Sequence, residues 1–295
     1  MRLRLLAPLL LLAAAPPQAE PAPAQQAHPA MWKLADADTT IWLFGSIHIL
    51  PAGTNWMDPR IKRAIDGSQS LTIETVLDEE PAKVGQILMA LGKGADLPPL
   101  TERVPATKRD ELAALVKASG YPDTFLNGMK SWAAAILLTG AALQQIGVDA
   151  AASPGVEPQL TALFRSGGKP VEGLETPEAQ LGFFNRLPES AQRAFLVATL
   201  DDPAKAREDF RKMIDAWSRG DPAAIEKSFA EDPEFTPALR DLLIRQRDQN
   251  WADVLAKRLD QPGTVFVAVG AGHLVGPVSV QAMLAKKGLK VEREQ

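Results

Sequence analysis

The architecture of this chain follows from the stretch Val265-Phe266-Val267-Ala268-Val269-Gly270-Ala271-Gly272-His273. An apolar run of this kind, ended by glycine, is typical of a buried strand in a parallel sheet. A second stretch near the start of the chain has the same pattern and reads Ile41-Trp42-Leu43-Phe44-Gly45-Ser46-Ile47-His48. Each apolar run leads into Gly-x-x-His, so we expect similar strands near the two ends of the chain.

The segments between these strands indicate an α/β fold. Asp58-Pro59 starts a helix, because Asp suits the N-cap and Pro suits the first helical position. Leu71-Thr72-Ile73-Glu74 is a short strand, and Lys169–Leu174 is another. We therefore expect a central mixed or parallel sheet formed by N- and C-terminal βα units, with a large helical insert at about 80–260.

The first residues have the features of a secretory signal peptide. Arg2 and Arg4 precede an apolar run, and Ala22-Pro23-Ala24 fits cleavage after Ala24. We expect residues 25–30 to be a disordered linker and residues 31–295 to form a single domain. The apolar run is too short to span a bilayer, so no stable membrane span is expected after cleavage. A periplasmic location follows, with an uncleaved N-terminal anchor as the alternative.

The composition excludes several classes of function. The chain has no cysteine, which rules out disulfides, thiolate metal sites and a cysteine nucleophile. Its net charge of −4 offers no electrostatic footprint for nucleic acid. The glycines from Gly270 to Gly276 resemble a dinucleotide fingerprint, but their spacing is Gly-x-Gly-x-x-x-Gly and His273 occupies the phosphate turn. A nucleotide site is therefore not expected.

Histidine is scarce, and this makes the two motif histidines informative. The chain has three histidines, of which His28 lies in the N-terminal segment, whereas His48 and His273 close the two motifs. Open α/β sheets bind ligands at the carboxyl ends of their strands. Imidazole is the commonest metal ligand and a general base near neutral pH. One such histidine alone would more often be a turn residue, but two in the same frame indicate a functional site.

Several charged residues are candidates for the same site. Glu74 ends an apolar strand and would lie beside His48 if the strands at 41–45 and 71–74 were parallel neighbours. The alternatives for Glu74 are exposure to solvent or an ion pair with Arg63. Glu157 suits the first turn of a helix, where a carboxylate favours the dipole. Glu175 suits a cap as well as a catalytic role, and Arg247 and Asn250 taken alone indicate a solvated helix face.

The motifs resemble those of the TraB/PrgY/GumN family, which is related to the Tiki proteases. The blocks around the two Gly-x-x-His motifs carry the resemblance, together with three internal blocks, and these segments are Phe44–Pro51, Gly155–Leu160, Leu174–Leu181, Arg247–Trp251 and Val269–Gly276. The resemblance extends over about residues 31–293, which is nearly the whole chain without its leader. The two Gly-x-x-His motifs together are a specific sign of this family, whereas either motif alone is a weak one.

The resemblance implies an α/β fold like that of the erythromycin-esterase and ChaN group. From the Tiki proteases it implies a divalent-metal-dependent protease, with Mn²⁺ or Co²⁺ as the usual ions. Carried over, His48, Glu74 and His273 form the core site and the metal ligands, with Glu175 and Arg247 as supports. Position 157 carries Glu where Asp is common in parts of the family. TraB and PrgY are associated with the shutdown of peptide pheromones, and GumN takes its name from a xanthan gene cluster.

Three functions are compatible with these residues. The first is a periplasmic metal-dependent hydrolase that acts on a peptide or another small substrate, since two imidazoles and a carboxylate suit Mn, Co or Zn. The metal would polarise the scissile carbonyl and lower the pKa of a bound water. The second is a metal-free, esterase-type hydrolase with His48 as general base. The third is a non-catalytic protein that binds a peptide or a glycan.

Overall fold

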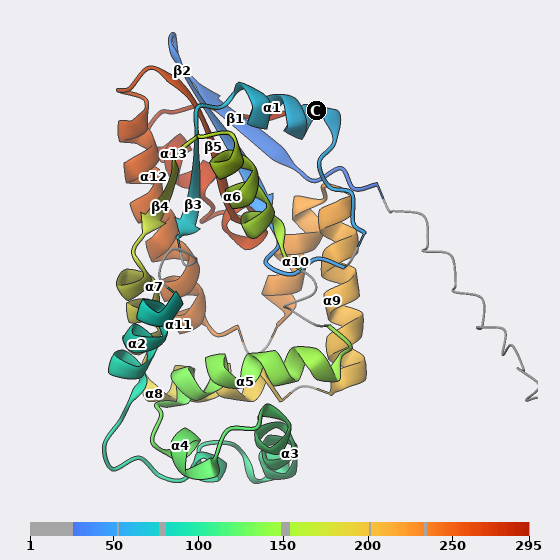
Figure 1. Ribbon diagram of the computed structural model, residues 1–295, viewed down its shortest axis with the longest axis vertical. Helices are drawn as coiled ribbons and strands as arrows, with labels where there is room; N and C mark the ends of the chain where they lie inside the picture. Colours follow the sequence, from blue (N-terminus) through green and yellow to red (C-terminus); the bar gives the residue numbers. More distant parts are fainter. Residues whose placement is uncertain are drawn as a thin grey trace, which may run out of the picture.

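The fold is organised around one mixed six-stranded sheet (Figure 1). The computed structural model describes residues 26–51, 53–76, 81–148, 154–200, 202–232 and 235–294, so the signal-peptide prediction for residues 1–24 lies outside them. The strands are β1 (Met31–Ala35), β2 (Thr39–Ser46), β3 (Ser70–Thr75), β4 (Val171–Glu175), β5 (Gly263–Gly270) and β6 (Val291–Glu294). The α/β class expected from the sequence is confirmed.

The strand order places the two ends of the chain side by side. The order across the sheet is β4-β3-β5-β2-β1-β6. Strands β4, β3, β5 and β2 are parallel, and β1 and β6 add an antiparallel edge. β2 and β3 are therefore not neighbours, as the sequence suggested they could be, because β5 lies between them. Strand β5 takes the central place because its apolar side chains can be buried on both faces of the sheet.

Side chains of β5 alternate between two hydrophobic cores. Phe266 and Ala268 pack with helices α1 (Pro59–Gly67) and α6 (Val156–Ser166) on one face. Val265, Val267 and Val269 pack with α12 (Gln246–Arg258) and α13 (Val280–Lys286) on the other. This alternation follows from the period of two along a strand, and it buries both faces of the central strands.

The remaining helices form most of the predicted insert. They are α2 (Pro81–Gly92), η1 (Leu100–Glu102), η2 (Ala106–Lys108), α3 (Arg109–Ser119), α4 (Asp123–Asn127), α5 (Ser131–Gln145), α7 (Pro177–Asn185), α8 (Glu189–Ala198), α9 (Pro203–Ser218), α10 (Pro222–Glu231), α11 (Pro237–Arg240), the π-helical η3 (Asp241–Arg245) and, after β5, η4 (Ala271–Leu274). The expected N-cap of α1 is present, because the Asp58 side chain accepts hydrogen bonds from the backbone of Arg60 and Ile61.

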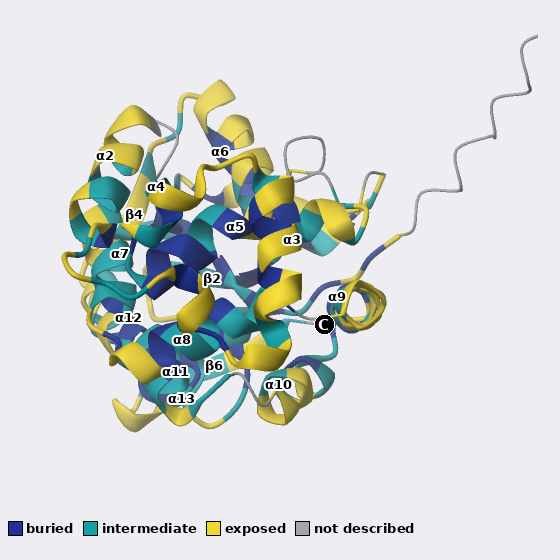
Figure 2. Cartoon of the chain, turned by 90° about the horizontal axis from the view of Figure 1, so that it is seen from below, coloured by how far each residue is buried: buried dark blue, intermediate teal, exposed yellow. Residues whose placement is uncertain are grey.

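The insert has a hydrophobic core of its own, away from the sheet. Buried residues of α3, α5 and α8 form much of this core, and α5 runs across the molecule with α3 and α4 beyond it, at the end opposite the sheet (Figure 1). Figure 2 shows the colour of buried residues on part of α5, whose first five residues are all buried, whereas α9 presents many exposed residues. The nearly all-apolar α5 is thus a core helix. Among the described helices, none is long and apolar enough to cross a membrane.

The segment just before β1 is held against the folded body. The Ala27 backbone N–H donates to Asn55 O at 2.9 Å, and that of His28 donates to Ser218 O at 2.7 Å. Ala27 is fully buried in the core beside the sheet. The structure therefore differs here from the disordered linker expected at 25–30, because two backbone hydrogen bonds and one buried side chain fix the described part of this segment.

Candidate active site

The two motif histidines and Glu74 meet at the carboxyl ends of three adjacent parallel strands. Strand β2 leads into His48, β5 leads into His273, and β3 carries Glu74 near its end. A Cβ atom added to Gly270 would lie 3.1 Å from Glu74 Oε1 and 3.7 Å from His48 Nε2. It would lie 3.6 Å from His273 Cδ2. The glycine at position 270 thus leaves open the space that the three side chains share.

His273 is buried and held in one orientation from both sides. Its Nδ1 lies 2.6 Å from Asp248 Oδ1, and its Nε2 lies 3.2 Å from Arg247 Nη1. In the neutral form of the ring, Nε2 accepts from Arg247, because a guanidinium can only donate hydrogen bonds, and Nδ1 carries the proton. The Trp251 ring packs on the imidazole with 4.4 Å between ring centroids. Nε2 therefore faces Arg247, and Glu74 Oε1 lies 3.7 Å from it.

Arg247 is the centre of a buried network of charges. Its Nη2 donates to Glu74 Oε2 at 2.6 Å and to Glu175 Oε2 at 2.9 Å, while its Nε donates to Glu175 Oε1 at 3.0 Å. Only 7% of Arg247 is exposed, so the solvated helix face indicated by this segment alone is wrong for Arg247, whereas Asn250 is exposed as expected. Burial alone would lower the pKa of Arg247, but the two carboxylates raise it above its ordinary value.

Glu74 is buried and ionised, and both of its carboxylate oxygens accept hydrogen bonds. Its Oε1 accepts from the Gly270 backbone N–H at 2.7 Å, and its Oε2 accepts from Gln180 Nε2 at 3.3 Å as well as from Arg247. Burial alone raises the pKa of a carboxyl group, but the attraction of His273, Arg247 and His48 outweighs it and lowers the pKa of Glu74 to about 2. The partner of Glu74 is therefore Arg247 rather than solvent or Arg63.

His48 differs from His273 because its side chain is open to solvent. Its Nδ1 lies 2.8 Å from Glu157 Oε1, while 70% of the His48 side chain is exposed. The hydrogen bond to Glu157 is the largest influence on this imidazole, and it raises the pKa of His48 to about 9 against the opposing effect of desolvation. The ring thus pairs with one carboxylate at Nδ1 and can meet a molecule from solution with the rest of its surface.

Glu157 reaches His48 because α6 begins directly against the first motif. The Val156 backbone N–H donates to Ile47 O at 2.9 Å. A Cβ atom on Gly155 would lie 2.2 Å from the His48 backbone carbonyl, so this close approach requires glycine. Glu157 Oε1 also accepts from Ser46 Oγ at 2.5 Å. The carboxylate therefore does more than favour the helix dipole, because it orients the exposed imidazole.

Asp248 is a residue of this site that the sequence interpretation missed. It is fully buried, and its Oδ2 is a buried oxygen without a hydrogen-bond partner in the described part of the chain. Burial raises the pKa of Asp248 to about 6, although the hydrogen bond and charge of His273 oppose this shift. A signal was present in the sequence, because Asp248 shares the helical spacing of Trp251, Ala252 and Leu255, which are buried.

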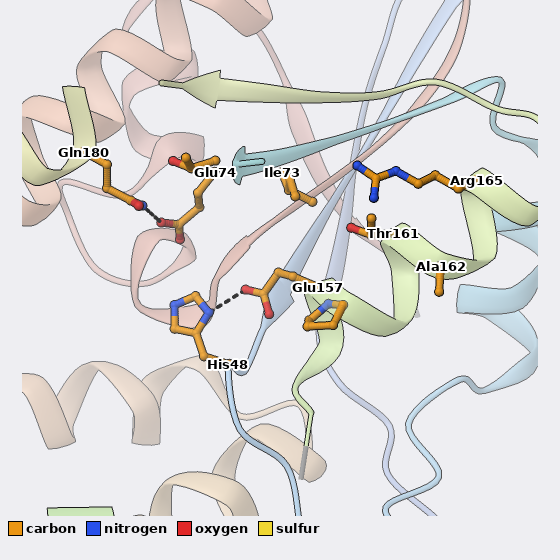
Figure 3. A pocket seen from close by; sticks show the side chains of 10 residues that line it. His48, Ile73, Glu74, Glu157, Thr161, Ala162, Arg165 and Gln180 are labelled. Carbon is orange, nitrogen blue, oxygen red and sulfur yellow. Dashed lines mark hydrogen bonds and ion pairs between the residues drawn. The ribbon is translucent and has the colours of Figure 1, made fainter. Parts of the chain in front are cut away.

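The site opens into a cavity of about 570 Å³ along α6 (Figure 3). His48 and Glu157 lie on one side of the view, joined by their hydrogen bond, and Glu74 and Gln180 lie across from them. A cavity of this size is within the range of small-molecule and peptide side-chain pockets. The described side chains therefore offer both reactive groups and room for a ligand.

The side chains of the site suit a divalent cation in type and in charge. Glu74 and Glu175 pair with Arg247, whereas Glu157 and Asp248 pair with the two histidines, so the site holds four carboxyl groups. Each histidine engages a carboxylate through Nδ1, an arrangement typical of metal-ligating histidines. As the described side chains stand, no three of them gather closely enough to hold an ion. These donor types fit a metal ion. In the present arrangement, however, Arg247 occupies the hydrogen-bonding positions at Glu74 and at His273 Nε2.

Comparison with known families identifies the chain. A family model described as TraB/PrgY/gumN family matches residues 30–293. The match covers nearly the whole chain, so this protein belongs to the TraB/PrgY/gumN family, as the motif blocks predicted. Comparisons with curated proteins and with solved structures gave no significant match.

Proposed function

We propose that this protein is a hydrolase, most simply a peptidase, whose reaction centre lies between His48, Glu74 and His273. One observation carries the proposal. Two imidazoles from opposite ends of the chain share one cavity mouth with a buried carboxylate, and each has its Nδ1 held by another carboxylate. This is how proteins prepare the Nε2 atom of histidine for a metal or a proton.

Each residue has a distinct task in this proposal. His48, Glu74 and His273 would hold a divalent ion, Mn or Co in the first place and Zn as an alternative. The chemistry that such an ion supplies is polarisation of the scissile carbonyl and a lower pKa for water. Arg247 keeps Glu74 ionised and lies next to the reacting groups, where its charge can stabilise a developing oxyanion. Glu175 positions Arg247, and Asp248 positions His273.

A metal-free hydrolase is the second candidate, and a specific contact favours it. The Arg247 guanidinium already lies at Glu74 and at His273 Nε2, where a metal ion would bind. In this version His48, oriented by Glu157, removes a proton from the attacking water. The raised pKa of His48, about 9, makes this base available only as the pH becomes alkaline.

Metal content and cleavage of peptides test the proposal directly. The purified protein would be analysed for Mn, Co and Zn, and then screened against a peptide library with and without added Mn²⁺ or Co²⁺. We expect cleavage that EDTA abolishes and that His48→Ala and His273→Ala remove, while the matched control His28→Ala keeps it. Activity that survives thorough chelation would select the metal-free version. Binding of peptides or glycans without turnover under any metal would select a non-catalytic protein and refute the proposal.

Export to the periplasm is part of the same proposal. It is supported by the pattern of Arg2, Arg4 and the apolar run before Ala24. Fractionation of bacterial cells that produce the full chain should place the protein in the periplasmic fraction at the mass expected after removal of residues 1–24. A full-length protein retained in the membrane fraction would indicate an uncleaved anchor instead.

A further inference from the structure

Two separate cavities meet at the reaction centre. The cavity of about 570 Å³ described above has walls from β3, α6 and α7, and we name it the α6 chamber. A second cavity of about 330 Å³ has walls from both motif turns, α9, α10 and η3, and we name it the α9 chamber. Among the described residues that line them, only His48 and Glu74 belong to both. These two residues therefore stand at the junction between the chambers.

The exposed surface of both chambers is mostly apolar, although charged side chains such as Arg165 and Glu157 also line the α6 chamber. Phe210, Met213, Phe229 and Ile244 line the α9 chamber together with residues of the motif turns. Ile73, Pro158 and Ala162 line the α6 chamber, in which Figure 3 shows Ala162 and Thr161 along the helix beyond Glu157. Apolar walls with a few placed polar groups are characteristic of ligand sites. Each chamber is of the size that such sites have.

The position of the junction determines how a substrate must lie. A bond that reacts beside His48 and Glu74 has one chamber on each side, so the groups that flank this bond enter different chambers. We propose that the protein binds an extended peptide across the junction, with an apolar side chain in each chamber, and cleaves an internal bond rather than a terminal one. This inference rests on the proposed hydrolase function and specifies its substrate class. Binding energy from both flanking groups is then available to position the scissile bond.

Two residues are placed to set the specificity of each side. Ala162 lies on the exposed surface of α6 within the α6 chamber, and Met213 lies on α9 within the α9 chamber. Ala162→Trp should fill the first chamber, and Met213→Trp should fill the second. Each has a matched control on the same helix, Leu163→Trp and Lys212→Trp, because Leu163 is 40% exposed and the Lys212 side chain is 62% exposed. Neither control residue lines either chamber.

The experiment uses internally quenched peptides with an acetylated N-terminus and an amidated C-terminus. We expect cleavage of such blocked peptides between two apolar residues, located by mass spectrometry. Ala162→Trp should lower kcat/KM about tenfold for a large residue on one side of the scissile bond, and a glycine on that side should restore it. Met213→Trp should do the same for the opposite side. The two controls should stay within about twofold of the unmodified protein.

Other outcomes overturn the inference or separate it from the proposed function. Cleavage only of peptides with a free terminus, or loss on the same side in both variants, refutes the two-sided cleft while the hydrolase function stands. If no peptide is cleaved under any metal, calorimetry with an acetylated and amidated apolar hexapeptide tests whether the two chambers bind a peptide at all. Binding that both tryptophan variants weaken supports the two chambers without catalysis. The absence of any binding refutes them.

Discussion

The two Gly-x-x-His motifs begin from nearly the same sequence and reach opposite environments. The His48 side chain is 70% exposed and has one carboxylate partner, whereas the His273 side chain is 7% exposed and is held by Asp248, Arg247 and Trp251. The motif itself specifies only a strand, a turn and an imidazole at the sheet edge. What surrounds each turn determines whether the histidine is a fixed part of the interior or a group that meets the substrate.

The largest expected effect is the loss of activity in both histidine variants. His48→Ala and His273→Ala should each lower kcat about 10²–10⁴-fold or more, because each removes a group proposed to act on the reacting atoms. Steady-state kinetics on a cleaved peptide, with His28→Ala as control, measure this. If only one of the two variants lost activity, the two motifs would not serve one reaction centre.

The buried charges around His273 lead us to expect a large loss of stability when Arg247 is replaced. Arg247→Met leaves Glu74 and Glu175 buried without their cation, so the free energy of unfolding should fall by about 3–5 kcal/mol. The matched control is Arg245→Met, whose side chain is 48% exposed and pairs with Asp241 on the surface. Its loss should change the free energy of unfolding far less, because ion pairs on the surface contribute little. Urea unfolding of both variants measures the difference, and equal losses would contradict the buried network.

A smaller difference in stability should separate the two histidines. His273→Ala leaves Asp248 buried without its partner and should cost about 1–3 kcal/mol in the free energy of unfolding. His48→Ala removes an exposed ring, and above about pH 9, where its pair with Glu157 no longer stabilises the fold, it should stay within about 0.5 kcal/mol of the unmodified protein, so both variants are compared at that pH. Thermal and urea unfolding in the presence of EDTA compare the two. A greater loss for His48→Ala than for His273→Ala would reverse the assignment.

The smallest effect is a shift in the titration of His48. Its pKa should be about 9, and Glu157→Gln should bring the pKa down towards its ordinary value of 6.5, because the hydrogen bond to Glu157 is the main cause of the shift. Since the folded-state pKa is raised, the stabilisation from this pair is complete below about pH 6.5 and is lost as the pH rises through about 9.

Nuclear magnetic resonance can follow this titration without ambiguity, because the chain has only three histidines to assign. The metal-free protein should be used, since a bound ion would displace the proton. Met213→Ala provides a control that changes the neighbouring chamber and leaves Glu157 in place. An unchanged His48 titration in Glu157→Gln would show that another group sets its pKa.

Some of the site could be predicted from the sequence because it depends on local pattern. Apolar runs that end in glycine define the strands, and the carboxyl ends of parallel strands bring His48, Glu74 and His273 to one sheet edge. The roles of Arg247 and Asp248 depend on partners far along the chain, such as Glu74, which is 173 residues from Arg247. A helix segment rich in charges indicates solvent unless those partners are known.

The strand order is the other feature that local pattern could not provide. Strands β2 and β3 are each plausible neighbours of β5 and of one another, since all three are short and apolar. Only the full sheet shows that β5 separates them. Gly270 then becomes the point around which three side chains gather, and a glycine that suggested only a turn is required by the space that the site needs.

The central position of β5 also governs when this protein can fold. Ribosomes release residues 263–270 long after the residues of β2 and β3, yet these residues form the strand between β2 and β3. Until they emerge, the earlier strands have no partner on that side, and His48 and Glu74 have no His273 to meet. Contacts between such distant segments make folding slow. The junction of β2, β5 and β3, and with it the group of His48, Glu74 and His273, therefore forms only after residues 263–270 have been made.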